Sequence, residues 1–241
     1  MTDLPVPVKE HPHWRVNFRP SSYDEELLPS LGACLKVIEA TKVRLRGWDY
    51  PHLSRRTEQR GQGSNFVASW SDFGHLEYWR FYQSGQFLHL FSVREAWNEA
   101  WKEQLRNTAR GHLGHFDVDW EHVPGFFSLN NFIYTVTEIF EFAARVAQHG
   151  VYEGPVSIGI RISGIEGFIL TPDWDRAWYE RYAPSESALE NNWIVESADL
   201  IASSSEHSFR AILWFFERFG WLEPAVEVIQ KDQLKFLEGK I

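Results

Sequence analysis

Residues 65–93 read NFVASWSDFGHLEYWRFYQSGQFLHLFSV, and this stretch decides the fold class. It contains three runs rich in aromatic and β-branched residues, at 65–71, 76–83 and 86–93. Such runs, separated by short segments with glycine, are typical of a three-stranded antiparallel meander. Between the last two runs, Ser84 and Gly85 are expected to form a two-residue turn.

The length of that turn decides which side chains of the hairpin share a face. A two-residue turn would place Arg80 opposite His89, among the rings of Tyr78, Tyr82, Phe87 and Phe91. An aromatic face with two polar side chains has to be covered by a helix, a partner or a ligand.

The rest of the chain alternates between strand-like and helical patterns. Strands are predicted at 13–19, at 43–47, at 193–197 and in a second hairpin formed by 155–163 and 166–170. Helices are predicted from about Pro29, over 94–109, from an N-cap at Ser128 to about His149, over 206–219 and after Pro224. We therefore expect an α+β fold with a mixed or antiparallel sheet, the meander at 65–93, packed helices and a C-terminal helix pair.

The order of these elements bears on the number of domains. It fits two α+β units, an N-terminal one over residues 1–110 and a C-terminal one over residues 126–241, joined by a polar segment rich in histidine. No segment has the composition of a long linker, so one continuous domain fits equally well.

The composition excludes several classes of protein. The single cysteine, Cys34, rules out an intramolecular disulfide framework and a cysteine-based zinc cluster. No run approaches the ~18 apolar residues of a membrane span, and no secretory signal pattern is present. We therefore expect a cytoplasmic protein without a membrane partner. Motifs for nucleotide phosphates, dinucleotides and serine nucleophiles are missing, so no cofactor is expected.

Residues 43–56, VRLRGWDYPHLSRR, combine arginines with aromatic rings in a chain of formal net charge -9. Guanidinium groups grip phosphates and carboxylates in a fork and stack on rings. The predicted ligand-binding or anion-binding site, which includes two residues of the hairpin, comprises Arg44, Arg46, Trp48, Tyr50, Arg55, Arg56, Arg80 and His89. In the alternative interpretation, Arg44 and Arg46 pair with acidic neighbours of the same chain.

A second candidate site lies in GHLGHFDVDWEHV at 111–123. If this segment is extended, its acidic and histidine side chains project to one face and offer ligands for a divalent cation. The residues of this alternative are His112, His115, Asp117 and Asp119. The spacing matches neither HExxH nor an EF-hand loop, and a solvated polar strand face explains the same pattern.

Three stretches resemble a known group of proteins. They are HPHWRVNFRP at 11–20, VRLRGWDYPHLS at 43–54 and EYWRFYQSGQFLHLF at 77–91. Together they are similar to an uncharacterised accessory region of bacterial proteins that carry a Schlafen-type nucleic-acid-binding module. The similarity covers residues 11–100 and does not include the module itself. It implies an accessory or sensing domain in a bacterial regulatory or defence setting, and it brings no catalytic residues.

Three functions follow as hypotheses. The leading one is a non-catalytic binding module that engages a protein partner or an anionic ligand through the arginine and aromatic surface. The rival is a divalent-metal-dependent hydrolase that uses residues 112–122. The third is a nucleic-acid-binding regulator, which depends on local positive charge because an acidic chain is a poor generic binder of nucleic acid.

Overall fold

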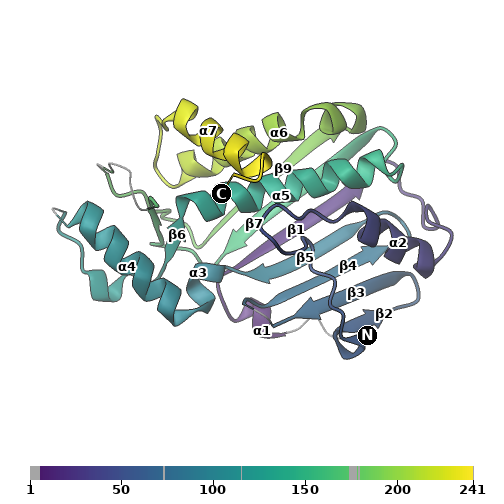
Figure 1. Ribbon diagram of the computed structural model, residues 1–241, viewed down its shortest axis with the longest axis horizontal. Helices are drawn as coiled ribbons and strands as arrows, with labels where there is room; N and C mark the ends of the chain where they lie inside the picture. Colours follow the sequence, from purple (N-terminus) through teal and green to yellow (C-terminus); the bar gives the residue numbers. More distant parts are fainter. Residues whose placement is uncertain (1–5, 73, 115, 174–177, 179, 241) are drawn as a thin grey trace.

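The computed structural model describes residues 6–72, 74–114, 116–173, 178 and 180–240. A seven-stranded antiparallel sheet forms the body of the molecule (Figure 1). Its strands are, in spatial order, β2 (Arg60–Gln62), β3 (Phe66–Ser71), β4 (Glu77–Tyr82), β5 (Phe87–Ser92), β1 (His13–Pro20), β7 (Pro155–Ser163) and β9 (Ala188–Glu196). Two short strands, β6 (Phe126–Ser128) and β8 (Ile169–Thr171), form a separate parallel pair. The predicted meander is confirmed as β3, β4 and β5.

The described helices vary from one turn to six. They are α1 (Val6–Lys9), α2 (Leu31–Thr41), α3 (Arg94–Trp97), α4 (Glu99–Leu113), α5 (Leu129–Gln148), α6 (Ser197–Arg218) and α7 (Val226–Leu237), with single 3₁₀ turns at Thr57–Gln59 and Trp120–His122. The α+β class and the C-terminal helix pair, α6 with α7, are confirmed. Within the described residues, no helix combines the length and apolarity that crossing a bilayer requires.

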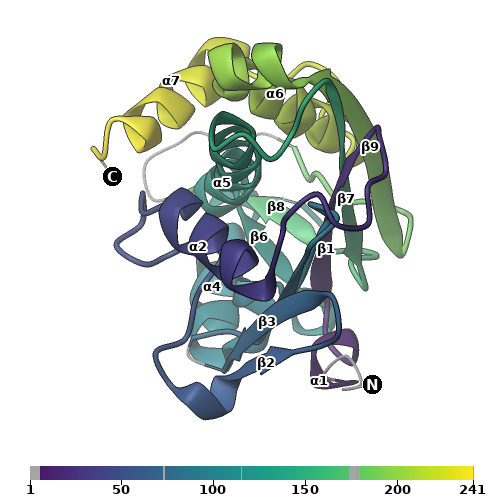
Figure 2. The same ribbon diagram turned by 90° about the vertical axis from the view of Figure 1, so that its right-hand side faces the viewer.

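Helices α2, α5, α6 and α7 lie on one side of the sheet (Figure 2). Helix α5 lies along the middle of this face, with α2 on one side of it and α6 and α7 on the other. Helix α4 extends beyond the end of the sheet beside β6 and β8 (Figure 1). Among the described helices, only the short α1 packs on the opposite face of the sheet.

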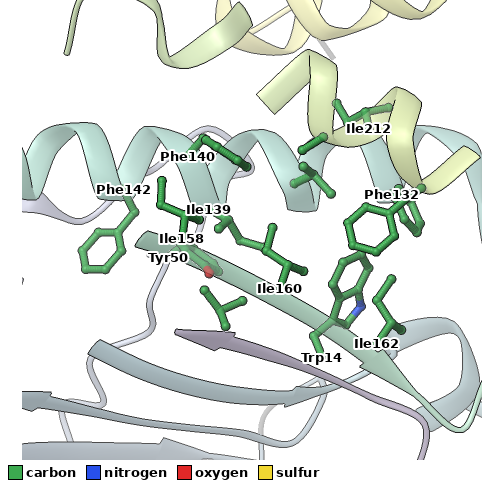
Figure 3. Packing of buried hydrophobic residues seen from close by; sticks show 14 of the residues in the cluster. Trp14, Tyr50, Phe132, Ile139, Phe140, Phe142, Ile158, Ile160, Ile162 and Ile212 are labelled. Atoms are coloured by element: carbon green, nitrogen blue, oxygen red, sulfur yellow. The ribbon is translucent and has the colours of Figure 1, made fainter. Parts of the chain in front are cut away.

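The main core fills the space between α5 and the sheet (Figure 3). Ile139 and Phe142 of α5 meet Ile158 and Ile160 of β7, and all four side chains are fully buried. The alternation of apolar residues along β7 produces this arrangement, because successive side chains of a strand point to opposite faces. Burial of each such side chain stabilises the fold by about 1.5–3 kcal/mol.

Strand β1 joins the two halves of the sequence into one sheet. It pairs with β5 along one edge and with β7 along the other. Strands from residues 1–110 and strands from residues 126–241 therefore share a continuous hydrogen-bonded sheet.

The register predicted for the β4–β5 hairpin is wrong by one residue. The backbone N–H of Tyr82 bonds the carbonyl of Gln86 at 2.9 Å, so the loop has three residues and not two. Gly85 adopts φ 74°, the left-handed conformation that such loops require. Trp79 therefore pairs with His89, and Arg80 points to the opposite face of the sheet from His89.

Two other strand predictions are also wrong. Residues 43–47 form no strand beyond a single bridge between Val43 and Tyr50. Residues 166–170 do not form a hairpin with 155–163, because both edges of β7 are taken by β1 and β9. Ile169 and Leu170 belong instead to β8, and Phe168 directly precedes it.

Helix boundaries agree with the sequence prediction at the start of α2 and differ from it at two other places. Helix α2 begins after Pro29, with Ser30 as its N-cap. The predicted helix at 94–109 is divided at Asn98, whose side chain caps α4. Helix α6 begins at Ser197, earlier than predicted, and bends at Ser203, which has φ -144°.

Candidate ligand-binding site

The predicted site residues occupy three separate places. Arg46, Trp48, Tyr50 and His89 surround a polar region between α5 and the helix-covered face of the sheet. The side chains that lie outside it, toward solvent or on the other face of the sheet, are Arg44, Arg55, Arg56 and Arg80. Arg55 and Arg56 line an outer cavity of about 560 Å³ together with Trp48. Because Arg80 lies on the other face of the sheet, the predicted residues do not form one continuous arginine and aromatic surface.

Arg46 is buried and fully engaged by α5. Its Nη2 lies 2.6 Å from Oε2 of Glu138 and 2.9 Å from the hydroxyl of Thr135, and its Nη1 donates to Asn131. Asn131, Thr135 and Glu138 lie on one helical face, since their spacing is four and three residues. This arginine therefore fixes the loop that follows α2 onto the first half of α5.

Arg44 lies at the surface and is also paired. Its Nε is 2.6 Å from Oδ1 of Asp49, and Lys42 binds the other oxygen of the same carboxylate at 2.7 Å. The alternative interpretation therefore describes Arg44 and Arg46, because each meets a carboxylate of its own chain. Arg46 therefore has no charge free for a ligand, whereas Arg44 shares one carboxylate with Lys42 and its side chain is 65% exposed.

Arg94, at the start of α3, was missed by the sequence prediction. Its guanidinium lies between two indoles, 4.6 Å from the ring centre of Trp48 and 4.3 Å from that of Trp101. Among the described residues, no hydrogen bond or ion pair is formed by this half-buried side chain. Burial, with a smaller effect from the nearby charge of Arg46, lowers the pKa of Arg94.

A cleft of about 480 Å³ opens beside this guanidinium. It lies between α4, the start of α5 and the loop that carries Trp48, which is 40% exposed. The cleft is lined by Arg46, Trp48, Arg94, Trp101, Gln104, Leu105, Thr108, Ser128, Asn130, Asn131, Tyr134, Pro172 and Asp173. Its volume falls in the range of small-molecule sites, as does its mixture of rings with a few polar groups.

A smaller chamber of about 40 Å³ lies deeper, behind Trp48. It shares with the cleft the side chains of Arg46, Trp48, Arg94 and Asn131. Its other polar lining residues include Asp49, Tyr50, His75, Glu77, Ser92, His89, Thr135 and Glu138. A chamber of this size has room for water but not for a substrate, so a ligand would bind in the outer cleft.

Glu77 is buried in this chamber against two histidines. Its Oε1 accepts a hydrogen bond of 2.8 Å from the backbone N–H of His52 and lies 2.9 Å from Nε2 of His89. Its Oε2 lies 3.4 Å from Nε2 of His75. Burial opposes ionisation, but the contacts with His75 and His89 outweigh it and hold the pKa of Glu77 below its ordinary value. Glu77 is therefore a carboxylate at neutral pH.

His89 is a neutral imidazole at neutral pH, because burial lowers its pKa from 6.5. Its Nδ1 lies 3.3 Å from the hydroxyl of Tyr50. A neutral ring has one donor and one acceptor nitrogen. Since Nε2 faces the carboxylate of Glu77, we assign the proton to Nε2 and the acceptor role to Nδ1.

Two further carboxyls are buried around α5. Burial raises the pKa of Glu138 and that of Glu95, in part against the effect of Arg46. Glu95 accepts a hydrogen bond of 2.7 Å from Asn131, whereas Oε1 of Glu138 has no hydrogen-bond partner among the described residues. The inner wall of the site therefore contains an unused acceptor, and its outer wall contains the unused donors of Arg94.

Residues 111–123, which the metal-site hypothesis assumes to be an extended strand, do not form one. His112 belongs to α4, Asp117 lies in an irregular stretch, and Asp119 lies 2.8 Å from Nδ1 of His122. His115 lies outside the described residues. Within the part of the chain that the structure describes, no group of three His, Cys, Asp or Glu side chains could hold a metal ion.

The new site residues come from distant parts of the sequence. Arg94 and Trp101 are seven residues apart, and this spacing could have indicated that they share one face of a helix. No local pattern relates them to Trp48. Glu77 and Glu138 lie in apolar runs whose pattern predicts a strand and a helix but indicates no site.

Comparisons of the chain with protein-family models, with curated proteins and with solved structures found no match. The resemblance of residues 11–100 to the accessory region of Schlafen-type proteins stays a prediction.

Proposed function

We propose that the chain is a non-catalytic binding module that holds an anionic group, a carboxylate or a phosphate, in the cleft at Arg94. The observation that carries this proposal is a half-buried guanidinium without an ionic partner among the described residues, at the wall of the 480 Å³ cleft. A cationic group in such a position is stabilised by an incoming anion, which replaces the hydration it has lost.

The two indoles prepare Arg94 for this role. Trp48 and Trp101 hold the guanidinium over their rings, and its N–H donors, which bond no described residue, are left for a ligand. A fixed fork loses little side-chain entropy on binding and matches the two oxygens of a carboxylate or phosphate. The remainder of the ligand would contact Tyr134 and Leu105 along the cleft.

Two sources supply the same chemistry, and both agree with an accessory or sensing module. One is a small organic acid or phosphate ester, and the other is an acidic side chain of a protein partner. Trp and Arg are enriched at the centres of protein interfaces, and Trp48 is partly exposed at the rim of the cleft. A bacterial origin, which the resemblance of residues 11–100 implies, and a cytoplasmic location are also parts of this proposal.

The test is a binding titration with three probes: inorganic phosphate, benzoate and a ten-residue polyglutamate peptide. Heat release and the shift in unfolding temperature would be measured for the unmodified protein, for Arg94→Gln and for Arg44→Gln. Arg44→Gln is the matched control, because it removes the same charge from an exposed position that already has Asp49 as a partner.

We expect at least one probe to bind and Arg94→Gln to weaken it tenfold or more, since a charge-assisted hydrogen bond contributes about 1.5–3 kcal/mol. Arg44→Gln should bind within twofold of the unmodified protein. Selective binding of the peptide would identify a protein partner, and selective binding of the small anions a metabolite. If all probes fail, or if both variants lose affinity equally, the proposal is wrong.

A further inference from the structure

The large helices leave one face of the sheet open (Figure 2). The residues of this face differ in composition from the rest of this acidic chain. Strand alternation places the apolar residues of β1 and β7 on the covered face and their polar residues on the open one. One row across the open face, read from the pairing register, consists of Trp70, Tyr78, Leu90, Arg15, Arg161 and Glu190. Trp70 and Tyr78 lie at one end of the row and the two arginines at the other, and Tyr78 and Leu90 are buried, at 4% and 3% exposed. The short α1 packs on β5 at this part of the face.

Two arginines of this face are exposed and unpaired. Arg15 and Arg19 lie four positions apart along β1, with Asn17 between them on the same face. Neither forms an ion pair or a hydrogen bond through its side chain among the described residues. Arg161 pairs with Glu190 at 2.7 Å. The open face thus has an excess of positive charge within a chain of net charge -9.

The neighbouring strands β3 and β4 supply flat rings. Phe66, Trp70 and Tyr82 are partly exposed on the open face, and Phe66 pairs with Tyr82 across the two strands. Arg80 stacks on this cluster, with its guanidinium 4.5 Å from the ring centre of Phe66. Aromatic side chains and guanidinium planes on a sheet are the surfaces on which unpaired bases stack.

A depression of about 440 Å³ lies at the arginine end of the row. It is lined by Lys9, His13, Arg15, Leu88, Leu90, Arg161 and Ser163. From β3 to β7 the row crosses four strand spacings, or about 19 Å. That distance is the length of several stacked bases.

We infer that the open sheet face binds single-stranded nucleic acid, with bases on the rings of β3 and β4 and phosphates at Arg15 and Arg19. This inference is independent of the anion site at Arg94, which lies on the covered side of the sheet. Charge complementarity selects a polyanion, and the partly buried rings select one whose bases are unpaired. A duplex keeps its bases stacked inside and would present only phosphates to this face.

The experiment is a fluorescence anisotropy titration, in which the protein is added to labelled oligo(dT) or oligo(U) of twenty nucleotides at 50 and 200 mM salt. The double variant Arg15→Gln with Arg19→Gln would be compared with Arg55→Gln with Arg56→Gln. This control removes the same charge from two exposed arginines that lie outside the open face. Tyr82→Leu tests the ring component.

We expect the unmodified protein to bind at least one oligonucleotide, with weaker affinity at the higher salt. The Arg15 and Arg19 variant should bind at least tenfold more weakly with a shallower salt dependence, whereas the control variant should stay within twofold. Tyr82→Leu should lower affinity at both salt concentrations without changing the salt dependence.

Three results would overturn the inference, provided that circular dichroism shows the variants to be folded. They are no binding at 50 mM salt, an equal loss in the control variant, and displacement by heparin or duplex DNA as efficient as by unlabelled oligonucleotide. The last result would mean a generic polyanion surface. Loss of binding in Arg94→Gln alone would place the nucleic acid in the cleft instead and would also contradict the inference.

Discussion

Arg46 and Glu138 lie 92 residues apart in the sequence and form a buried ion pair, with 2.6 Å between Nη2 and Oε2. The side chain of Glu138 is 1% exposed and that of Arg46 is 9% exposed. The pair ties the loop that carries Trp48 to α5, and it thereby sets the back wall of the cleft. Its energetics are therefore part of how the candidate site is built.

Removal of one partner from this pair should destabilise the protein strongly. Arg46→Met leaves a carboxylate buried without its counterion, which costs about 3–5 kcal/mol. Replacement of both partners, Arg46→Met with Glu138→Leu, should recover most of that loss, because an apolar pair of similar volume needs no hydration. Urea unfolding at pH 7 measures all three proteins.

The control for the ion-pair prediction is Arg44→Met, which breaks an exposed pair with Asp49 and should cost no more than about 1 kcal/mol. A double variant less stable than Arg46→Met would contradict the prediction. It would mean that the site depends on the hydrogen bonds to Asn131 and Thr135 more than on the charge.

The buried histidine of the chamber should make the fold sensitive to mild acid. Because burial lowers the pKa of His89, the unfolded chain binds a proton below pH 6.5 more readily than the folded chain does. Stability is therefore lost as pH falls below 6.5. The lowered pKa of Glu77 adds a second loss that starts only below its ordinary value of 4.5.

Urea midpoints at pH 7.5, 6.0 and 5.0 would show this dependence. His89→Gln should be less stable than the unmodified protein at pH 7.5 but should have a flatter profile between pH 7.5 and 5.0. Lowered pKa values of His13 and His207 leave a residual slope in the variant. Parallel profiles for the two proteins would show that His89 does not titrate as its burial requires.

The sequence predicts the parts of this fold that depend on neighbours along the chain. Ser128 caps α5 as expected, with its hydroxyl accepting from the N–H of Asn131, and the alternation of β1 matches its burial. The candidate site needs information that no local pattern contains. The partner of Arg44 is five residues away and was foreseeable, whereas Arg46 finds Glu138 only after α5 has packed on the sheet.

The failure at the β4–β5 turn has a similar physical origin. Two-residue and three-residue loops both accept glycine, so the local sequence around Gly85 does not predict which loop length forms. One added loop residue moves every side chain of the paired strand by one position, which separates Arg80 from His89. Packing of Phe87 and His89 against the core decides the register.

Gly85→Ala should measure how strongly that turn is constrained. Gly85 has φ 74°, and an added Cβ would lie 3.0 Å from Cδ2 of Leu27 and 3.2 Å from Cγ1 of Val151. We expect a loss of about 1–2 kcal/mol from the left-handed backbone alone, with a further loss from crowding.

Gly150→Ala is the matched control for the turn, because Gly150 has φ 83° and no atom within 4 Å of an added Cβ. It should show the backbone cost without the crowding. Equal losses in the two variants, measured by urea unfolding, would mean that Leu27 and Val151 move aside freely.

Cys34 offers a reporter for the packing of α2 against the sheet. The thiol is fully buried, and burial raises its pKa to about 11. Only the thiolate attacks a disulfide reagent, so a thiol that is both buried and protonated should react with Ellman's reagent at pH 8 far more slowly than glutathione does. The rate should rise with urea in parallel with unfolding, because α2 must first separate from the sheet.

Cys34→Ala gives the background rate. Rapid stoichiometric labelling of the native protein would mean that α2 separates from the sheet without global unfolding, and the covered face of the sheet would then be accessible through that end.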